Sequence, residues 1–445
     1  MINRTLLKDL LEWKDRTRHK PLVLRGARQV GKTTIVDEFS KNYDVYLRLN
    51  LEKEKDRMLF EEDDMDKLVT SIFYHCKKLK TKKSVLLFID EIQNSKKAVA
   101  SLRYFYEELN YIDVISAGSL LETLMDVRDI SFPVGRVEFM YLRPCSFYEF
   151  LDGMGEHFDL EIINRLDVEG NVIHERLISL FNDYVLVGGM PELIKEYSVN
   201  RDINAVNIFY ESILNAYKDD VEKYTKNSHL IEVVRAILTY GWNYAAETIT
   251  FEKFGGTAYS SRDMSAAFQI INKAMMLELV YPTSSVRLPI ISNLRKKPKL
   301  LWLDTGLVNY ISGIQYDVFS ASNIQDIWRG RIAEHIVGQE ILCLDNRVSA
   351  NRSFWRRDVK TSEAEVDFIL PYKGLLIPIE VKSGHRSRLK SLMSFMEEAP
   401  HNLAVRVWGE PFSVEEITLP SGKIIKLINL PFYYVGKIKE VLDNI

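Results

Sequence analysis

The octapeptide GARQVGKT, at residues 26–33, restricts the fold of this chain more than any other stretch. It matches the pattern G-x-x-x-x-G-K-T, in which two glycines let the backbone turn tightly around a phosphate group. The apolar stretch PLVLRG precedes it, and KTTIVDEF, which is expected to form a helix, follows it. A strand, a glycine-rich loop and a helix in this order predict a parallel α/β sheet with a phosphate site at the loop.

A second motif, LLFIDEIQ, places Asp90 and Glu91 after four apolar residues. In a doubly wound sheet the end of this buried strand lies beside the phosphate loop. We expect Lys32 to reach the β- and γ-phosphates of ATP, Thr33 and Asp90 to hold Mg²⁺, and Glu91 to polarise the attacking water. The sequence therefore predicts ATP and Mg²⁺ as cofactors. The residues predicted to bind the nucleotide are Gly26, Ala27, Arg28, Gln29, Val30, Gly31, Lys32, Thr33, Thr34 and Asp90.

Two further residues are candidates for a part in hydrolysis. Ser119 follows the strand-like stretch VISAG, where it would either position the water or cap the next helix. Arg136, in SFPVGRVEFMYLRP, is a candidate transition-state arginine that acts in cis or from a neighbouring subunit. Arg128 competes for that role, and an ordinary surface position is the alternative for both arginines.

The length of 445 residues predicts several domains rather than one. Residues 1–150 alternate apolar strands with amphipathic helices and are expected to form the ATPase core. Residues 151–227 are expected to form its helical extension, with a turn at VGGMPE. We expect a small α/β module over 228–320 and a further α/β domain over 321–445. The predicted fold class is therefore α/β.

The overall composition limits where such a chain would act. A formal net charge of −3 argues against a broadly basic surface, so contacts to nucleic acid would need local patches. The three cysteines are too far apart in the sequence for a zinc set with Cys-x-x-Cys spacing. The sequence shows no signal-peptide core and no run of ~20 apolar residues. A cytoplasmic protein without membrane contact is expected.

A charged hairpin, AEVDFILPYKGLLIPIEVKSG, is predicted at residues 364–384. If Lys373 and Gly374 form a two-residue turn, Asp367 faces Glu380 and Glu365 faces Lys382. Because side chains alternate along a strand, all four would project from one face. Opposed carboxylates repel each other unless a cation compensates them, and hard oxygen ligands suit Mg²⁺.

These residues make a candidate metal site for phosphodiester chemistry. Asp367 and Glu380 would supply ligands, and Lys382 would either position the attacking water or stabilise charge on the phosphate. Glu334, in GRIAEHIVGQEIL, is the candidate for a further acid. The alternative interpretation is an exposed hairpin with a Glu365–Lys382 ion pair and no chemistry.

Five motifs together resemble a known family: RGARQVGKT, LFIDEIQ, AGSLLE, GRVEFMYLRPCSFYEFL and VGGMPE. The chain is similar to prokaryotic AAA-type ATPases with a C-terminal domain of unknown function, family 4143. KPKLLWLDTGLVNYISG resembles the C-terminal signature of that family. The resemblance implies an AAA module, a middle winged helix and a C-terminal fold similar to PD-(D/E)XK endonucleases.

The middle module carries the stretch RKKPK at residues 295–299, with Arg262 and Lys273 nearby. At the wing of a winged helix these cations would contact DNA phosphates, although such modules also bind proteins. We expect an ATPase whose nucleotide state controls a C-terminal domain that acts on nucleic acid. The alternative is an ATP-dependent switch or scaffold whose inactive nuclease-like domain binds a protein partner. A homo-oligomer is compatible with either function.

Overall fold

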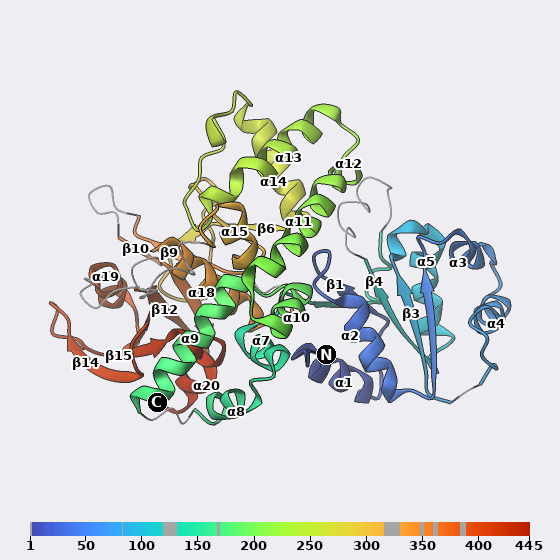
Figure 1. Ribbon diagram of the computed structural model, residues 1–445, viewed down its shortest axis with the longest axis horizontal. Coiled ribbons are helices and arrows are strands. Elements are labelled where there is room, and N and C mark those ends of the chain that lie inside the picture. The colour runs from blue at the N-terminus through green and yellow to red at the C-terminus, as the bar shows by residue number, and fades with distance from the viewer. Residues whose placement is uncertain are drawn as a thin grey trace.

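The computed structural model describes residues 2–81, 83–118, 131–166, 170–315, 330–347, 351–358, 364–382 and 389–445. Figure 1 shows the N-terminal sheet and its helices as a lobe on one side of the molecule. The C-terminal sheet lies on the other side, and helices α7 to α11 run between the two. Within the described residues no helix is both long enough and apolar enough to cross a membrane.

The N-terminal sheet is parallel throughout, with strand order β2-β3-β4-β1-β5. Its strands are β1 (Leu22–Arg25), β2 (Val45–Asn50), β3 (Val85–Asp90), β4 (Ile112–Ala117) and β5 (Glu138–Tyr141). The helices of this lobe are α1 (Leu6–Asp15), α2 (Lys32–Phe39), α3 (Glu54–Met58), α4 (Met65–His75) and α5 (Lys96–Glu107). Every residue of β3 is buried, as expected for a strand covered on both faces. The predicted α/β class is confirmed.

Helices dominate the next part of the chain. They are α7 (Phe147–Met154), α8 (His157–Arg165), α9 (Asn171–Val187), α10 (Pro191–Asn200), α11 (Ile203–Asp219) and α12 (Val221–Tyr224). A capping box fixes the start of α7, where Ser146 and Glu149 each bond the backbone N–H of the other. VGGMPE forms the break between α9 and α10, and Pro191 occupies the first turn of α10.

The middle module places two helices beside a small antiparallel sheet. The helices α13 (Ser228–Tyr240) and α14 (Ser261–Lys273) pack on each other, and strands β6 (Leu277–Val280) and β8 (Lys299–Trp302) pair. Thr248 adds an antiparallel bridge to Lys299. The predicted basic tip is wrong for Lys299, because this residue lies in β8 and its side chain is buried.

The C-terminal part begins with α15 (Thr305–Ile311) and α18 (Arg331–Cys343). Its main sheet has the order β11-β12-β13-β15-β14, with parallel pairs at the centre and antiparallel pairs at both edges. These strands are β11 (Phe368–Tyr372), β12 (Leu375–Val381), β13 (Leu403–Trp408), β14 (Ser413–Thr418) and β15 (Ile424–Pro431). Helices α19 (Lys390–Glu398) and α20 (Ile438–Asp443) complete it. A second sheet, of order β10-β9-β7, joins β10 (Glu365–Val366), β9 (Phe354–Arg356) and β7 (Pro282–Thr283).

The register of the predicted hairpin is confirmed. Tyr372 pairs with Leu375 and Phe368 pairs with Ile379, so Lys373 and Gly374 form the two-residue turn. Both turn residues have positive φ, at 43° and 83°, as a tight turn of the primed type requires.

The predicted pairing of Glu365 with Lys382 is wrong. The chain bends at Asp367, whose carboxylate accepts a hydrogen bond from the Val381 N–H at 2.8 Å. Beyond this bend Glu365 pairs with Arg356 of β9, in the other sheet. Lys382 instead makes an ion pair with Glu380 at 2.7 Å.

One continuous apolar core joins the parts of the molecule. It contains side chains from one face of the N-terminal sheet, from helices α7 to α11, from the middle module and from β12 and β13. Separate clusters cover the other face of the N-terminal sheet and the α19 face of the C-terminal sheet. The phosphate loop and the C-terminal domain are therefore packed against the same apolar core.

Candidate functional site

The phosphate loop connects β1 to α2 and depends on both of its glycines. A Cβ on Gly26 would lie 2.5 Å from the Leu142 carbonyl oxygen, so any side chain would collide with backbone. Gly31 caps α2 with φ at 96°, in the left-handed region that other residues rarely adopt. The loop therefore presents its backbone N–H groups at the start of a helix, where anions bind favourably.

Lys32, Thr33 and Asp90 lie together at the carboxyl end of the sheet. The Lys32 ammonium donates to the Gly26 and Ala27 carbonyls, at 2.8 Å each. The Thr33 hydroxyl donates to the Asp90 carboxylate at 3.0 Å. Burial lowers the pKa of Lys32 to about 8, although Glu91 and Asp90 oppose this shift. A hydroxyl next to a carboxylate is a ligand pair that fits Mg²⁺.

Glu91 follows β3 in the left-handed conformation, with φ at 53° and ψ at 45°. The Gln93 amide donates a hydrogen bond to the Glu91 carboxylate. The charge of Glu91 acts on both Lys32 and Arg28. Because Glu91 directly follows Asp90, which bonds Thr33, it lies at the same end of the sheet as the phosphate loop.

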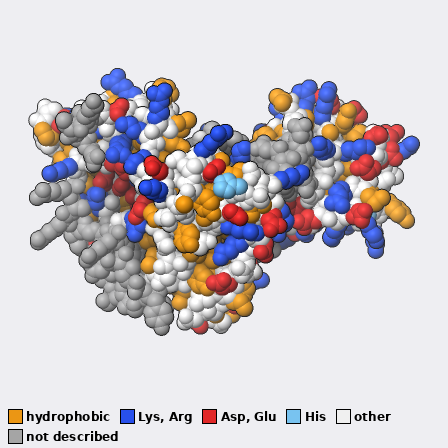
Figure 2. All heavy atoms as spheres, turned by 90° about the horizontal axis from the view of Figure 1, so that it is seen from above, with side chains coloured by type: hydrophobic (Ala, Val, Ile, Leu, Met, Phe, Trp, Pro, Cys, Tyr) orange, Lys and Arg blue, Asp and Glu red, His pale blue; other side chains and the backbone are white. Residues whose placement is uncertain are grey.

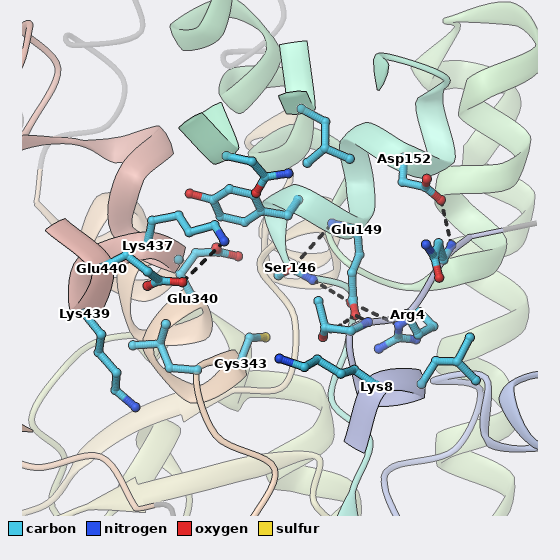
Figure 3. A pocket seen from close by; sticks show the side chains of 18 of the residues that line it. Arg4, Lys8, Ser146, Glu149, Asp152, Glu340, Cys343, Lys437, Lys439 and Glu440 are labelled. Atoms are coloured by element: carbon cyan, nitrogen blue, oxygen red, sulfur yellow. Dashed lines mark hydrogen bonds and ion pairs between the residues drawn. The ribbon is translucent and has the colours of Figure 1, made fainter. Parts of the chain in front are cut away.

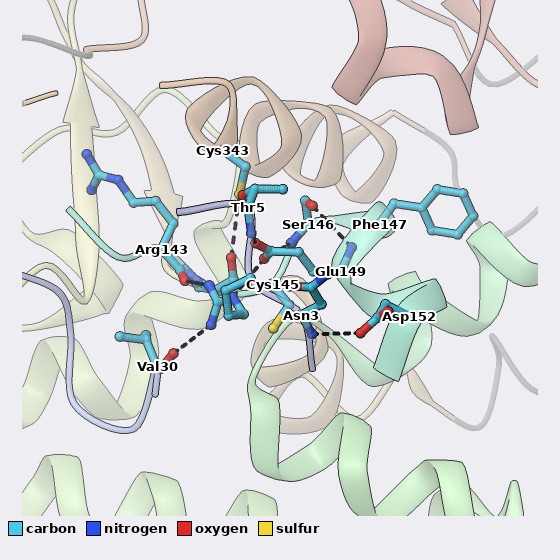
Figure 4. Close-up of polar contacts among 12 residues, drawn as sticks. Asn3, Thr5, Val30, Arg143, Cys145, Ser146, Phe147, Glu149, Asp152 and Cys343 are labelled. Atoms are coloured by element: carbon cyan, nitrogen blue, oxygen red, sulfur yellow. Dashed lines mark hydrogen bonds and ion pairs between the residues drawn. The ribbon is translucent and has the colours of Figure 1, made fainter. Parts of the chain in front are cut away.

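Arg4, which the sequence did not single out, contacts both the phosphate loop and α7; its partners Val30, Arg143 and Glu149 are labelled in Figure 4. Its guanidinium donates to the Val30 carbonyl at 2.8 Å, to the Arg143 carbonyl at 2.5 Å and to the Glu149 carboxylate at 3.0 Å. The side chain is 8% exposed. One buried guanidinium therefore ties the phosphate loop to the start of α7.

Of the other two catalytic candidates, the structure describes only Arg136. Ser119 lies outside the described residues, as does Arg128. Arg136 precedes β5 at the amino end of the parallel strands, whereas the phosphate loop follows their carboxyl ends. It makes an ion pair with Glu107 at 2.6 Å. Within its own chain Arg136 thus lies at the opposite end of the sheet from the phosphate loop, which leaves a role in trans or an ordinary surface position.

The C-terminal candidates surround a buried lysine that the sequence did not assign to this site. Lys299 makes ion pairs with Glu334 and, at 3.2 Å, with Glu365. Its side chain is 3% exposed, and its ammonium lies 4.6 Å from the centre of the Phe354 ring. We call Glu334, Glu365, Asp367, Glu380, Lys299 and Lys382 the acidic cluster.

Burial is the largest cause of the pKa shifts of the Glu334, Asp367 and Glu380 carboxyl groups in the acidic cluster. It raises the pKa of Glu334 to about 8 despite the opposing charge of Lys299. It also raises the pKa of Asp367, and that of Glu380 to about 7, to which the charge of Asp367 adds. One oxygen of Glu380, Oε2, is buried and has no hydrogen-bond partner within the described ranges. Over the described part of the chain, no three His, Cys, Asp or Glu side chains converge as a ready set of metal ligands.

Three motifs for which the sequence predicts no chemical role meet where α7, α9, α15 and α18 pack together. We call this buried contact the joint. The Gly189 N–H donates to the Asp304 carboxylate at 2.5 Å, and the Cys145 N–H donates to the Gly189 carbonyl at 2.6 Å. Glu340 accepts from the Phe147 N–H at 3.0 Å and from the Tyr184 hydroxyl at 2.8 Å. Thus VGGMPE, WLDTG and RPCSFYEF are explained by packing at this joint rather than by catalysis.

A cavity of about 630 Å³ opens beside the joint (Figure 3). Residues of the N-terminal segment, α7, α18 and the C-terminal end line it, with both signs of charge represented by Lys8, Glu149, Lys437 and Glu440. Lys437 and Glu440 pair with each other across 3.3 Å. Figure 2 likewise shows acidic and basic side chains intermixed over the face that it presents.

Three family profiles match successive parts of the chain. One described as an AAA domain matches residues 18–151, and a domain of unknown function, DUF8612, matches residues 178–317. A second domain of unknown function, DUF4143, matches residues 329–433. No curated protein matches the sequence.

Solved structures with a related arrangement include a Walker-type ATPase of Pyrococcus abyssi, at 15% identity and a TM-score of 0.46. That likeness covers 70% of this chain and 96% of the other. The ORC2 protein of Aeropyrum pernix is similar at 10% identity and a TM-score of 0.30, over 72% of this chain and 96% of that one. Likenesses of this size do not bear on substrate or partner.

The AAA profile spans the phosphate loop and the Asp90–Glu91 pair, and the DUF4143 profile spans α18 and the charged hairpin. This is the order of domains that the motifs predict. The chain therefore carries an AAA domain and, C-terminal to it, a DUF4143 domain.

Proposed function

We propose that this protein hydrolyses ATP and that its nucleotide state controls a C-terminal domain acting on nucleic acid. Lys32 binds the β- and γ-phosphates, while Thr33 and Asp90 would hold Mg²⁺. Glu91 orients and polarises the attacking water. The grouping of these four side chains at the carboxyl end of one parallel sheet supports this assignment.

The observation that carries the proposed control is the buried path from the phosphate loop to α18. Arg4 joins Val30 of the loop to Glu149 of α7. The first residue of α7, Phe147, donates to Glu340 of α18. Glu334 of the acidic cluster lies on the same helix as Glu340. A displacement of the loop therefore has a contiguous route to the cluster.

The topology supports the finer fold assignments that belong to this proposal. The helices α13 and α14 followed by the β6–β8 pair are consistent with a winged helix. The helix α18, the strands β9, β11 and β12, the helix α19 and the strand β13 follow the order expected of a PD-(D/E)XK-like core. We therefore assign nucleic acid as the ligand class of these two modules.

The acidic cluster fits a divalent cation by its charge. It holds four carboxyl groups and two ammonium groups, and among the described residues Glu380 Oε2 has no hydrogen-bond partner. Asp367 and Glu380 would hold the ion, since Mg²⁺ prefers carboxylate oxygens. Lys382, whose ammonium lies 2.7 Å from Glu380, would stabilise charge on a bound phosphate.

The position of Lys299 inside the acidic cluster supports a second candidate function. Its ammonium already neutralises Glu334 and Glu365 from inside the cluster. In this alternative the domain is a scaffold that keeps the fold without cleavage and binds a protein partner under control of ATP.

The experiment measures ATP hydrolysis, Mn²⁺ binding and DNA or RNA cleavage on the purified chain. Glu91→Gln should lower kcat for ATP by about 100-fold or more while nucleotide binding is kept. Asp367→Ala should abolish Mn²⁺ binding without affecting the ATPase. Mn²⁺ binding without any cleavage or nucleic-acid binding would favour the scaffold, and absence of ATP hydrolysis would refute the first step.

A further inference from the structure

The Arg28 side chain connects the phosphate loop to a distant helix. Its guanidinium makes an ion pair with Asp220, which directly follows α11. The Arg28 side chain is 37% exposed, whereas that of Asp220 is 3% exposed. The Tyr217 hydroxyl donates to the Arg28 carbonyl at 3.2 Å, so the end of α11 contacts both the backbone and the side chain of this residue.

Arg28 also belongs to the electrostatics of the nucleotide site. Burial lowers its pKa, but Asp220 and, at longer range, Glu91 raise it above the ordinary value. Arg28 in turn lowers the pKa of Lys32. Arg28 is itself a residue of the phosphate loop, between Gly26 and Gly31, and its side chain is partly exposed there. Arginine binds phosphate with two parallel hydrogen bonds.

Asp220 also pairs with a second cation, which would remain if the Arg28 guanidinium moved to another partner. Lys223 makes an ion pair with the other carboxylate oxygen of Asp220 at 2.7 Å. Removal of Arg28 would thus not strand an unpaired buried carboxylate, which is the costly state. The arrangement allows the guanidinium to change partners.

Resting on the proposed ATPase function, we propose that Arg28 exchanges Asp220 for the terminal phosphate of ATP and thereby reports the nucleotide state to α11. ADP lacks the terminal phosphate, so Arg28 stays with Asp220 when ADP is bound. ATP and Asp220 compete for one guanidinium, and each therefore weakens the hold of the other.

The end of α11 is well placed to pass this change to the middle module. Helix α12 begins directly after Asp220, and its residue Glu222 pairs with Arg235 of α13 at 3.0 Å. Farther back along α11, Tyr210 stacks on Tyr310 of α15 with ring centres 4.7 Å apart. Loss of the Arg28–Asp220 ion pair would thus remove one restraint on the end of α11 and on α12, which contacts α13.

The test is the ratio of affinities for a non-hydrolysable ATP analogue and for ADP, measured by fluorescence titration of the full chain. Asp220→Asn releases Arg28 in advance and should raise the preference for the ATP analogue about fivefold or more. Arg28→Gln should lower that preference. In the Arg28→Gln background, Asp220→Asn should change nothing. Lys223→Gln, which removes the other cation of Asp220, is the matched control and should not raise the ratio.

Equal changes in both affinities, or an Asp220→Asn effect that persists without Arg28, would overturn the exchange. If Asp220→Asn does not fold, an unchanged ratio in Arg28→Gln overturns it instead. A wild-type chain that binds neither nucleotide would refute the ATPase function itself, which separates the two failures.

Discussion

Lys299 is the residue on which the charge balance of the acidic cluster depends. Its ammonium is buried, contacts two carboxylates and faces the Phe354 ring. Taking an ammonium out of water is costly unless partners compensate it, and the carboxylates of the cluster have the same requirement. Lys299 and its acidic neighbours therefore stabilise each other.

Replacement of Lys299 by Met should lower the free energy of unfolding by about 3–5 kcal/mol, because it leaves buried carboxylates unpaired. Lys296→Met is the matched control from the same basic stretch. Lys296 pairs with Asp358 at 3.1 Å but is 47% exposed, so its loss should cost about 0–1 kcal/mol. Urea denaturation of both variants measures the difference, and equal losses would show that the Lys299 pairs do not stabilise the fold.

The grouping of Lys32, Thr33 and Asp90 could be predicted because these residues lie in two short motifs with strong local patterns. Lys299, Asp220 and Arg4 could not. Their carboxylate or guanidinium partners are 35, 192 and 145 positions away, and no local pattern marks such a pair. Sequence reasoning assigned Lys299 to an exposed tip because a lysine after proline in a basic run is usually solvated.

At the scale of elements, the joint between α7, α9, α15 and α18 depends on two positions where backbones approach closely. A Cβ on Gly306 would lie 2.1 Å from the Val187 carbonyl oxygen, and one on Gly188 would lie 2.2 Å from Asp304. Glycine is needed at these positions because two helices meet there without space for a methyl group. The joint is thus a rigid contact between the helical region and the C-terminal part.

Gly306→Ala should lower the free energy of unfolding by about 3 kcal/mol, the upper part of the range for an overpacked core. Gly313→Ala, two residues after the end of α15, is the control. Its φ is 69° with nothing near the added Cβ, so the cost should be about 1 kcal/mol from backbone strain alone. Thermal unfolding compares the two, and a smaller loss for Gly306→Ala would contradict the close contact.

The joint should also make stability depend on pH through Glu340. Burial raises the pKa of this carboxyl from 4.5 to about 7. The folded state therefore binds the Glu340 proton more tightly than the unfolded state does. The stability that this proton contributes is fully present below pH 4.5 and is lost as the pH rises through 7. Glu340→Gln should flatten the fall of the melting temperature between pH 5 and 8. An identical slope in wild type and variant would assign the pH dependence to other groups.

The charged hairpin shows how far element-scale prediction extends. Its turn and register follow from alternating side chains around Lys373 and Gly374, which is local information. The bend at Asp367 was missed because it depends on a hydrogen bond to the Val381 N–H and on β9, which offers Glu365 another sheet. The order of domains was predictable, whereas the joint between them was not.

At the scale of the whole molecule, the shared apolar core makes the nucleotide site and the acidic cluster parts of one packed structure. Packed interiors transmit displacement through discrete rearrangement rather than gradual deformation. Two connections run from the phosphate loop, one through Arg4 to α7 and α18 and one through Arg28 to α11. A change of nucleotide should therefore alter the dynamics of the C-terminal domain.

Hydrogen exchange of the Glu91→Gln variant with Mg²⁺ and either ATP or ADP tests this claim most directly. We predict that exchange in α18 and in β12 differs between the two nucleotides, and that the added Lys32→Ala change removes the difference. Exchange differences confined to residues 18–151 would contradict the claim, because the nucleotide would then act on the AAA domain alone.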